Sequence, residues 1–133
     1  MKSADAKRAL DACRAKATEI GKPVSICILD GAGLMVMFER FNDPPPQTAI
    51  VAEGKAAGAA LTGRPSAALQ QIADNRPMMA HALAARLGGR FVPLQGAVPL
   101  NYANGTVGAI GVSGATSEED ETIAKAGAAA LGM

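Results

Sequence analysis

The chain has 133 residues, of which 49% are hydrophobic and 19% are charged, and its formal net charge at pH 7 is +1. A near-neutral chain without a basic stripe interleaved with aromatic residues is a poor nucleic-acid binder, and no apolar run is long enough to cross a membrane. The N-terminal stretch MKSADAKRALDACRAKA is charged throughout and lacks the apolar core of a secretory signal, so we expect a cytoplasmic protein.

The apolar residues are mainly small. Alanine is the commonest, and beside 15 glycines the chain has three phenylalanines, one tyrosine and no tryptophan. Small side chains bury little apolar area each. We therefore expect a single domain over residues 1–133 that gains stability by forming a homo-oligomer. Cys13 and Cys27 are too few and too far apart for a zinc site or a disulfide framework, and we expect both to be buried thiols.

The first part of the chain predicts a helix followed by a β-hairpin. Apolar residues recur at three- and four-residue intervals within Ser3–Ile20, as on one face of an amphipathic helix. Val24–Leu29 and Leu34–Phe41 are rich in bulky apolar residues, and the turn signal DGAG lies between them. The first of these strands is apolar at nearly every position, which predicts burial on both faces.

Three helices are predicted next, because proline and glycine breaks separate Gln47–Leu61, Ser66–Ala73 and Pro77–Leu87. Three short strands and a last helix follow, with the hairpin signal Asn104-Gly105 before the third strand. The predicted order is α-β-β-α-α-α-β-β-β-α, an α+β fold in which helices flank a five-stranded antiparallel sheet. The three strands are Phe91–Leu94, Val98–Tyr102 and Thr106–Ser113, and the last helix is Glu118–Leu131.

The segment GAIGVSGATSEEDETI at residues 108–123 runs from a strand into this last helix. Glycine-rich loops that enter a helix can bind phosphate. Here four carboxylates open the helix, where they complement its dipole and would repel phosphate, and Thr116 and Glu119 have capping-box spacing. We therefore expect Gly108 and Gly111 to admit a closely packed neighbour.

Four segments, DGAGLMVMFER, GKAAGAALTGRPSAAL, PLQGAVPL and VGAIGVSGATSEEDETIAKAGAAAL, carry a resemblance over nearly the whole chain. Together they resemble the GlcG/HbpS-like family, to which the C-terminal domain of the PduO corrinoid adenosyltransferases belongs. The resemblance implies a profilin-like fold with a five-stranded antiparallel sheet between helices, and assembly into dimers or higher oligomers. Some members bind haem, so haem or a related tetrapyrrole is the first candidate ligand.

Arg40 and Lys55 are the first candidate ligand-binding residues. Arg40 ends a predicted strand, whereas Lys55 lies among alanines and glycines, either at a solvent-exposed helix edge or in a pocket. The resemblance matches Lys55 to a lysine of the family. Together the two cations could hold the carboxylates of haem propionates or of a small acid. Ser113 and Glu119 could face the mouth of the same pocket.

His81 and Tyr102 are the candidate haem ligands, since histidine and tyrosine both ligate haem iron. His81 is the only histidine, and as an alternative it is a packed or surface residue of its helix. Tyr102 is equally a half-buried strand residue before a tight turn. No firm metal-ligand set is present.

The sequence leaves three functions open. The first is a small-molecule-binding protein, with haem as the first candidate. The alternative is a small catabolic enzyme, of isomerase or lyase type, that moves a proton on a carboxylate-containing substrate. Its catalytic residues stay unassigned, because the chain has no Ser-His-Asp order, nucleophile elbow or metal triad. The third is an oligomeric scaffold without a ligand.

Overall fold

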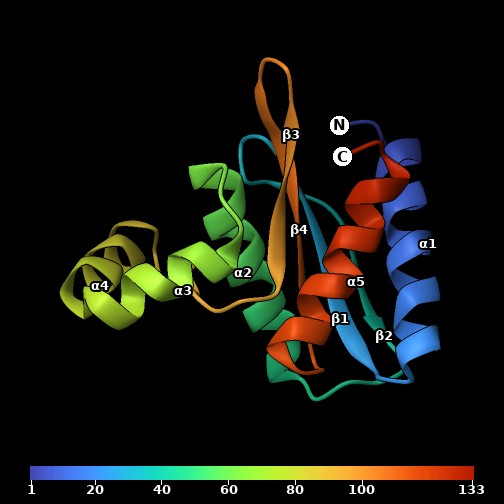
Figure 1. The fold of residues 1–133 in the computed structure, drawn as a ribbon, viewed down its shortest axis with the longest axis horizontal. Helices are drawn as coiled ribbons and strands as arrows, with labels where there is room; N and C mark the ends of the chain where they lie inside the picture. Colours follow the sequence, from blue (N-terminus) through green and yellow to red (C-terminus); the bar gives the residue numbers. More distant parts are fainter.

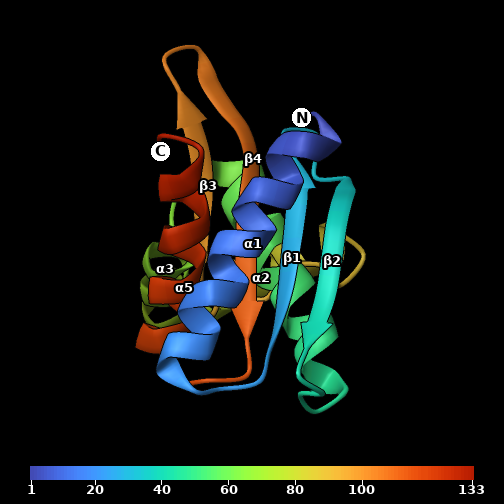
Figure 2. The ribbon, with the colours of Figure 1, turned by 90° about the vertical axis from the view of Figure 1, so that its right-hand side faces the viewer.

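The structure is a computed structural model that describes residues 1–133, and its centre is a four-stranded antiparallel sheet between helices (Figures 1 and 2). The strand order in the sheet is β2-β1-β4-β3. The helices are α1 (Ser3–Ile20), α2 (Gln47–Thr62), α3 (Ser66–Asn75), α4 (Pro77–Arg86) and α5 (Ser117–Ala130), and the strands are β1 (Val24–Asp30), β2 (Met35–Phe41), β3 (Ala97–Tyr102) and β4 (Gly105–Ser113).

The sheet has a core on each face. Helices α1 and α5 lie together on one face, and α2 covers the other (Figure 2). Ile26 and Ile28 of β1 belong to the core beneath α1 and α5, whereas Cys27 and Leu29 belong to the alanine-rich core beneath α2. All four side chains are fully buried, which confirms the prediction that this strand is covered on both faces.

One of the five predicted strands, Phe91–Leu94, does not form, so the five-stranded sheet and the predicted element order are wrong. The observed order is α-β-β-α-α-α-β-β-α. The backbone of this segment turns to the helices instead: the Val92 N–H donates to the Gly54 carbonyl oxygen of α2 at 3.2 Å. Phe91 packs under α3 and α4. Pro93 has no N–H to give to a sheet.

The glycines of β4 allow close packing, as expected. A Cβ atom on Gly111 would collide with the Ala52 carbonyl oxygen of α2 and would lie 2.8 Å from the Ala56 Cβ. A Cβ atom on Gly108 would collide with the Leu29 carbonyl oxygen of the adjacent strand. Both positions therefore serve the packing of the fold.

Helix α5 begins with the predicted capping box. The Thr116 hydroxyl accepts a hydrogen bond from the Glu119 N–H at 3.2 Å, and the Glu119 carboxylate accepts one from the Thr116 N–H at 3.1 Å. These bonds satisfy two backbone donors and fix the direction in which α5 leaves the sheet. None of the five helices combines the length and the apolar character that crossing a membrane requires.

The α3–α4 hairpin projects from the rest of the molecule (Figure 1). Helix α4 packs mainly against α3 and leaves apolar side chains in solvent, with Met78 84% exposed and Leu83 40% exposed. The opposite end of the molecule holds both chain ends, at the start of α1 and just after α5 (Figure 1).

Candidate functional site

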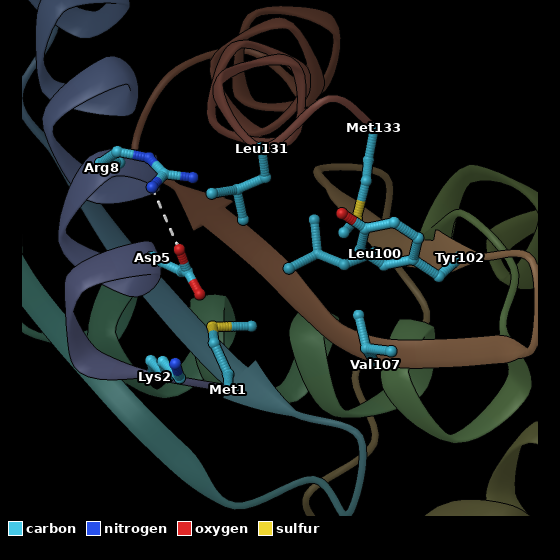
Figure 3. Close-up of a pocket in the computed structure, with 9 residues that line it drawn as sticks. All are labelled: Met1, Lys2, Asp5, Arg8, Leu100, Tyr102, Val107, Leu131 and Met133. Carbon is cyan, nitrogen blue, oxygen red and sulfur yellow. Dashed lines mark ion pairs between the residues drawn. The ribbon is translucent and has the colours of Figure 1, made fainter.

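A groove of about 610 Å³ opens where α1 begins, α5 ends and the β3–β4 hairpin extends from the sheet (Figure 3). Six of its nine lining residues are hydrophobic. We call it the terminal groove, because both chain ends contribute to it. Its lining residues are Met1, Lys2, Asp5, Arg8, Leu100, Tyr102, Val107, Leu131 and Met133.

The floor of the terminal groove depends on a glycine. Leu100 of β3 is fully buried and lies opposite Gly108 of β4 in the sheet register. A Cβ atom on Gly108 would lie 2.8 Å from the Met1 Cε, so the missing side chain makes room for the methionine. Val107 and Leu131 complete the apolar walls. The floor is therefore formed by the sheet. The walls come from the chain start before α1, from β4 and from the residues after α5.

Charged groups lie at one edge of the groove, and a phenol lies at the other (Figure 3). The Arg8 Nη1 is 3.1 Å from the Asp5 Oδ1, and both side chains are well exposed, so this ion pair contributes at most about 1 kcal/mol. Lys2 belongs to no ion pair. Tyr102 is 62% exposed, forms no side-chain hydrogen bond, and extends its ring across the groove. The groove thus offers two cations, one carboxylate and one free phenol.

His81 lies elsewhere. It is exposed on α4 and lines a second groove, of about 290 Å³, together with Pro77, Phe91 and Pro93. The structure therefore places the two predicted haem ligands, His81 and Tyr102, in different grooves.

Lys55 points into the interior, with 4% of its side chain exposed. Its Nζ donates to the Val112 carbonyl oxygen at 3.0 Å and lies 3.1 Å from the Asp120 Oδ2. The other carboxylate oxygen of Asp120 accepts a hydrogen bond from the Ala115 N–H at 2.9 Å. A Cβ atom on Gly96 would lie 2.6 Å from the Lys55 Nζ, so this glycine leaves space for the ammonium group.

The Lys55–Asp120 ion pair joins α2, on one face of the sheet, to α5 on the other. Burial raises the pKa of Asp120, although the ammonium of Lys55 and the hydrogen bond from Ala115 act in the opposite direction. Every polar atom of the pair that is buried has a partner. The pair is therefore a closed internal contact that leaves no free group for a ligand.

Arg40 does not join Lys55. Its Nη2 donates to the Pro44 carbonyl oxygen at 2.7 Å and lies 3.6 Å from the Asp43 Oδ1, in the loop that follows β2. The prediction that Arg40 and Lys55 together hold the carboxylates of a ligand therefore needs correction, because Lys55 is buried and pairs with Asp120. Neither cation lines the terminal groove.

Ser113 and Glu119 are likewise absent from the terminal groove. Ser113 is buried at the end of β4, opposite Ser25 in the register, and its hydroxyl forms no hydrogen bond. Glu119 caps α5 and lies 3.8 Å from the Lys22 Nζ. The hydrogen bond from the Thr116 backbone is the main reason why the pKa of Glu119 is lowered.

Sequence reasoning missed Asp120, although a signal was present. Asp120 shares the buried stripe of α5 with Ile123, Ala124 and Gly127, which follow it at the helical spacing of three, four and seven. A carboxylate on such a stripe requires a buried partner. Lys2 and Arg8 carried no comparable signal, because surface cations at the start of a helix are common.

The other reactive side chains do not form a site. Burial raises the pKa of both Cys13 and Cys27 to about 12, so neither thiol is ionised near neutral pH. No group of three or more histidine, cysteine, aspartate or glutamate side chains is arranged to hold a metal ion.

Comparison with known proteins gives a consistent result. A sequence profile of the family described as "Haem degrading protein HbpS-like" matches residues 1–129. A 15.0 kDa protein of Citrobacter freundii, described as uncharacterized and encoded in the dhaT-dhaS intergenic region, is 29% identical over 124 residues, which cover 92% of this chain and 85% of that protein.

Two solved structures are similar over nearly the whole chain. A double mutant of HbpS from Streptomyces reticuli has 28% identity and a TM-score of 0.86, covering 100% of this chain and 88% of that chain. A PduOC–haem complex has 25% identity and a TM-score of 0.86, covering 98% of this chain and 94% of that chain.

Proposed function

The chain belongs to the HbpS-like family, and we propose that it binds haem, or a related tetrapyrrole, in the terminal groove. The observation that carries this proposal is that one groove combines a mostly apolar lining with the unpaired positive charge of Lys2. The similar PduOC structure is a complex with haem, which supports haem as the ligand class.

The residues of the terminal groove fit such a ligand. A haem has a broad apolar ring and two carboxylate groups. The groove volume of about 610 Å³ lies within the usual range for small-molecule sites, roughly 300–1,000 Å³, and most of its lining is apolar. Lys2 and Arg8 lie at its edge, where each could pair with a carboxylate.

The groove beside His81 fits less well. At about 290 Å³ it is smaller than the usual range, and α4 rests mainly on α3. This groove supplies the imidazole of His81 but has little apolar surface to cover a haem ring.

When bound, haem supplies an iron atom that can take axial ligands and change its oxidation state. The residues of this chain would bury part of the ring against Leu100, Val107 and Leu131, and would hold its carboxylates at Lys2 and Arg8. The alternative of a catabolic enzyme has no support in the structure, because Lys55, the cation predicted to bind the carboxylate of a small acid, is buried in its pair with Asp120.

A titration with ferric haem, followed by absorbance, tests this proposal. We expect a saturable Soret band for the wild-type chain. In Val107→Glu, a carboxylate enters the groove and should weaken haem binding by about tenfold or more through repulsion of the haem carboxylates and loss of apolar contact. Val107 is 39% exposed, so the substitution should leave the fold intact.

Leu34→Glu is the matched control, since Leu34 is an exposed apolar residue, 62% exposed, in the β1–β2 turn and outside the groove. It should bind haem like the wild type. The absence of a Soret band at stoichiometric haem would reject haem binding, and equal affinity in both variants would reject the terminal groove as its place.

A further inference from the structure

We infer that Tyr102 is the side chain that would bind the haem iron, and that the terminal groove would therefore hold oxidised haem and release it on reduction. This inference rests on the proposed function and adds to it the atom that binds the iron and the condition for release.

The donor atoms that line the groove leave few choices. The nine residues include no histidine and no cysteine, so the only uncharged side-chain donors are the Tyr102 phenol and the thioethers of Met1 and Met133. A phenolate is an anionic oxygen ligand, whereas a thioether is neutral and soft. Ferric iron, with its higher charge, favours the phenolate.

The position of Tyr102 suits this role. Its side chain comes from the end of β3, two residues beyond the buried floor residue Leu100, and its ring extends across the groove toward the apolar wall (Figure 3). The phenol has no hydrogen-bond partner that a ligand would need to displace. Iron could therefore bind it without breaking a contact within the chain.

The charges around the groove favour a bound molecule that carries carboxylate groups, as haem does. Lys2 and Arg8 carry two positive charges against the one negative charge of Asp5, and all three lie at the same edge (Figure 3). The net positive edge attracts the haem carboxylates, which places the ring between these cations and Tyr102 at the other edge (Figure 3). No other side-chain carboxylate lines the groove.

Reduction reverses the binding step. Tyr102 would give its phenol proton to water as its oxygen binds ferric iron. A one-electron reductant would lower the charge on the iron, so the phenolate oxygen would let go of it and take back a proton from water. The apolar walls and the two cations would then be the only contacts that hold the haem.

The first arm of the test uses ferric haem with three chains: wild type, Tyr102→Phe and His81→Ala. We expect an iron–phenolate vibration in the resonance Raman spectrum of the wild type and of His81→Ala, and its loss in Tyr102→Phe. The Kd of Tyr102→Phe should rise about tenfold or more. Because the Tyr102 side chain is exposed and forms no hydrogen bond, removing its hydroxyl should leave the fold unchanged.

The second arm measures transfer of haem to an excess of apomyoglobin before and after addition of dithionite. Transfer from the wild type should become about tenfold faster or more on reduction, and transfer from Tyr102→Phe should change little. Tyr102→His, which supplies a ligand that holds both oxidation states, should abolish the acceleration.

The outcomes separate the two proposals. A wild-type Soret band that is unchanged in Tyr102→Phe and lost in His81→Ala would overturn the assignment of Tyr102 while leaving haem binding in place. Equal transfer rates before and after reduction would overturn redox-dependent release. The absence of any Soret band in the wild type would reject the proposed function itself.

Discussion

The Lys55–Asp120 pair and the Asp5–Arg8 pair use the same chemistry with opposite consequences. Both join a cation to a carboxylate at 3.1 Å. The first is almost completely buried and completes its hydrogen bonds within the fold, whereas the second is exposed at the edge of a groove. Burial therefore decides whether a charged pair holds the structure together or remains available to a ligand.

The largest effect is expected for Lys55→Met. This substitution leaves the Asp120 carboxylate buried without its cation, and breaking such a pair costs about 3–5 kcal/mol of the free energy of unfolding. Urea denaturation followed by circular dichroism would measure it. The double variant Lys55→Met/Asp120→Leu should recover much of the loss, because no unpaired charge remains. A change below about 1 kcal/mol in Lys55→Met would show that the pair is not an internal brace.

The next prediction concerns pH. Burial raises the pKa of Asp120, so in the window between its unfolded pKa, about 3.9, and its higher folded value the folded chain holds a proton that the unfolded chain has lost. This group therefore makes the free energy of unfolding fall as pH rises through that window, by up to about 1.4 kcal/mol per pH unit. Measured against Asp120→Asn, the wild type should show this slope. An opposite slope would mean that Lys55 outweighs burial.

A smaller effect is expected at the groove edge. Arg8→Gln should weaken ferric haem binding by a few fold, and should change the free energy of unfolding by less than about 0.5 kcal/mol, because surface substitutions rarely do more. Arg64→Gln is the control, since Arg64 is exposed, belongs to no ion pair and lies outside the groove. Equal haem affinity in both variants would show that Arg8 does not hold a haem carboxylate.

The smallest effect is expected for Asp5→Asn, which removes the ion-pair partner of Arg8. Haem affinity should rise about twofold, corresponding to a few tenths of a kcal/mol. The same substitution made in Arg8→Gln should have less effect. If the gain is equally large there, Asp5 acts by direct repulsion of the ligand.

Much of the fold could be predicted because its signals are local. The apolar run of β1, the turn at 30–33 and the capping box of α5 each lie within a few neighbouring residues, and all three are present. The missing strand at Phe91–Leu94 shows the limit. Phe91 does become buried and Val92 half-buried, but against helices, and periodicity over four residues cannot distinguish the two environments.

The site was harder to predict because it depends on contacts between distant segments. The pairing of Lys55 with a carboxylate 65 positions away determines which way the lysine points. Tyr102 was chosen for its chemistry, but its companions in the groove are Lys2 and Arg8, nearly a hundred residues earlier in the chain. Only the fold brings the start of α1 beside the end of β3.

The meeting of both chain ends at the groove has a practical consequence for biochemistry on this protein. Any affinity tag or fusion partner joined to Met1 or Met133 emerges beside the cavity and competes with its occupant for space (Figure 3). A polyhistidine tag would, in addition, supply the imidazoles that the cavity itself lacks and create artificial iron coordination. Measurements of ligand uptake should therefore be made after the tag has been cleaved off.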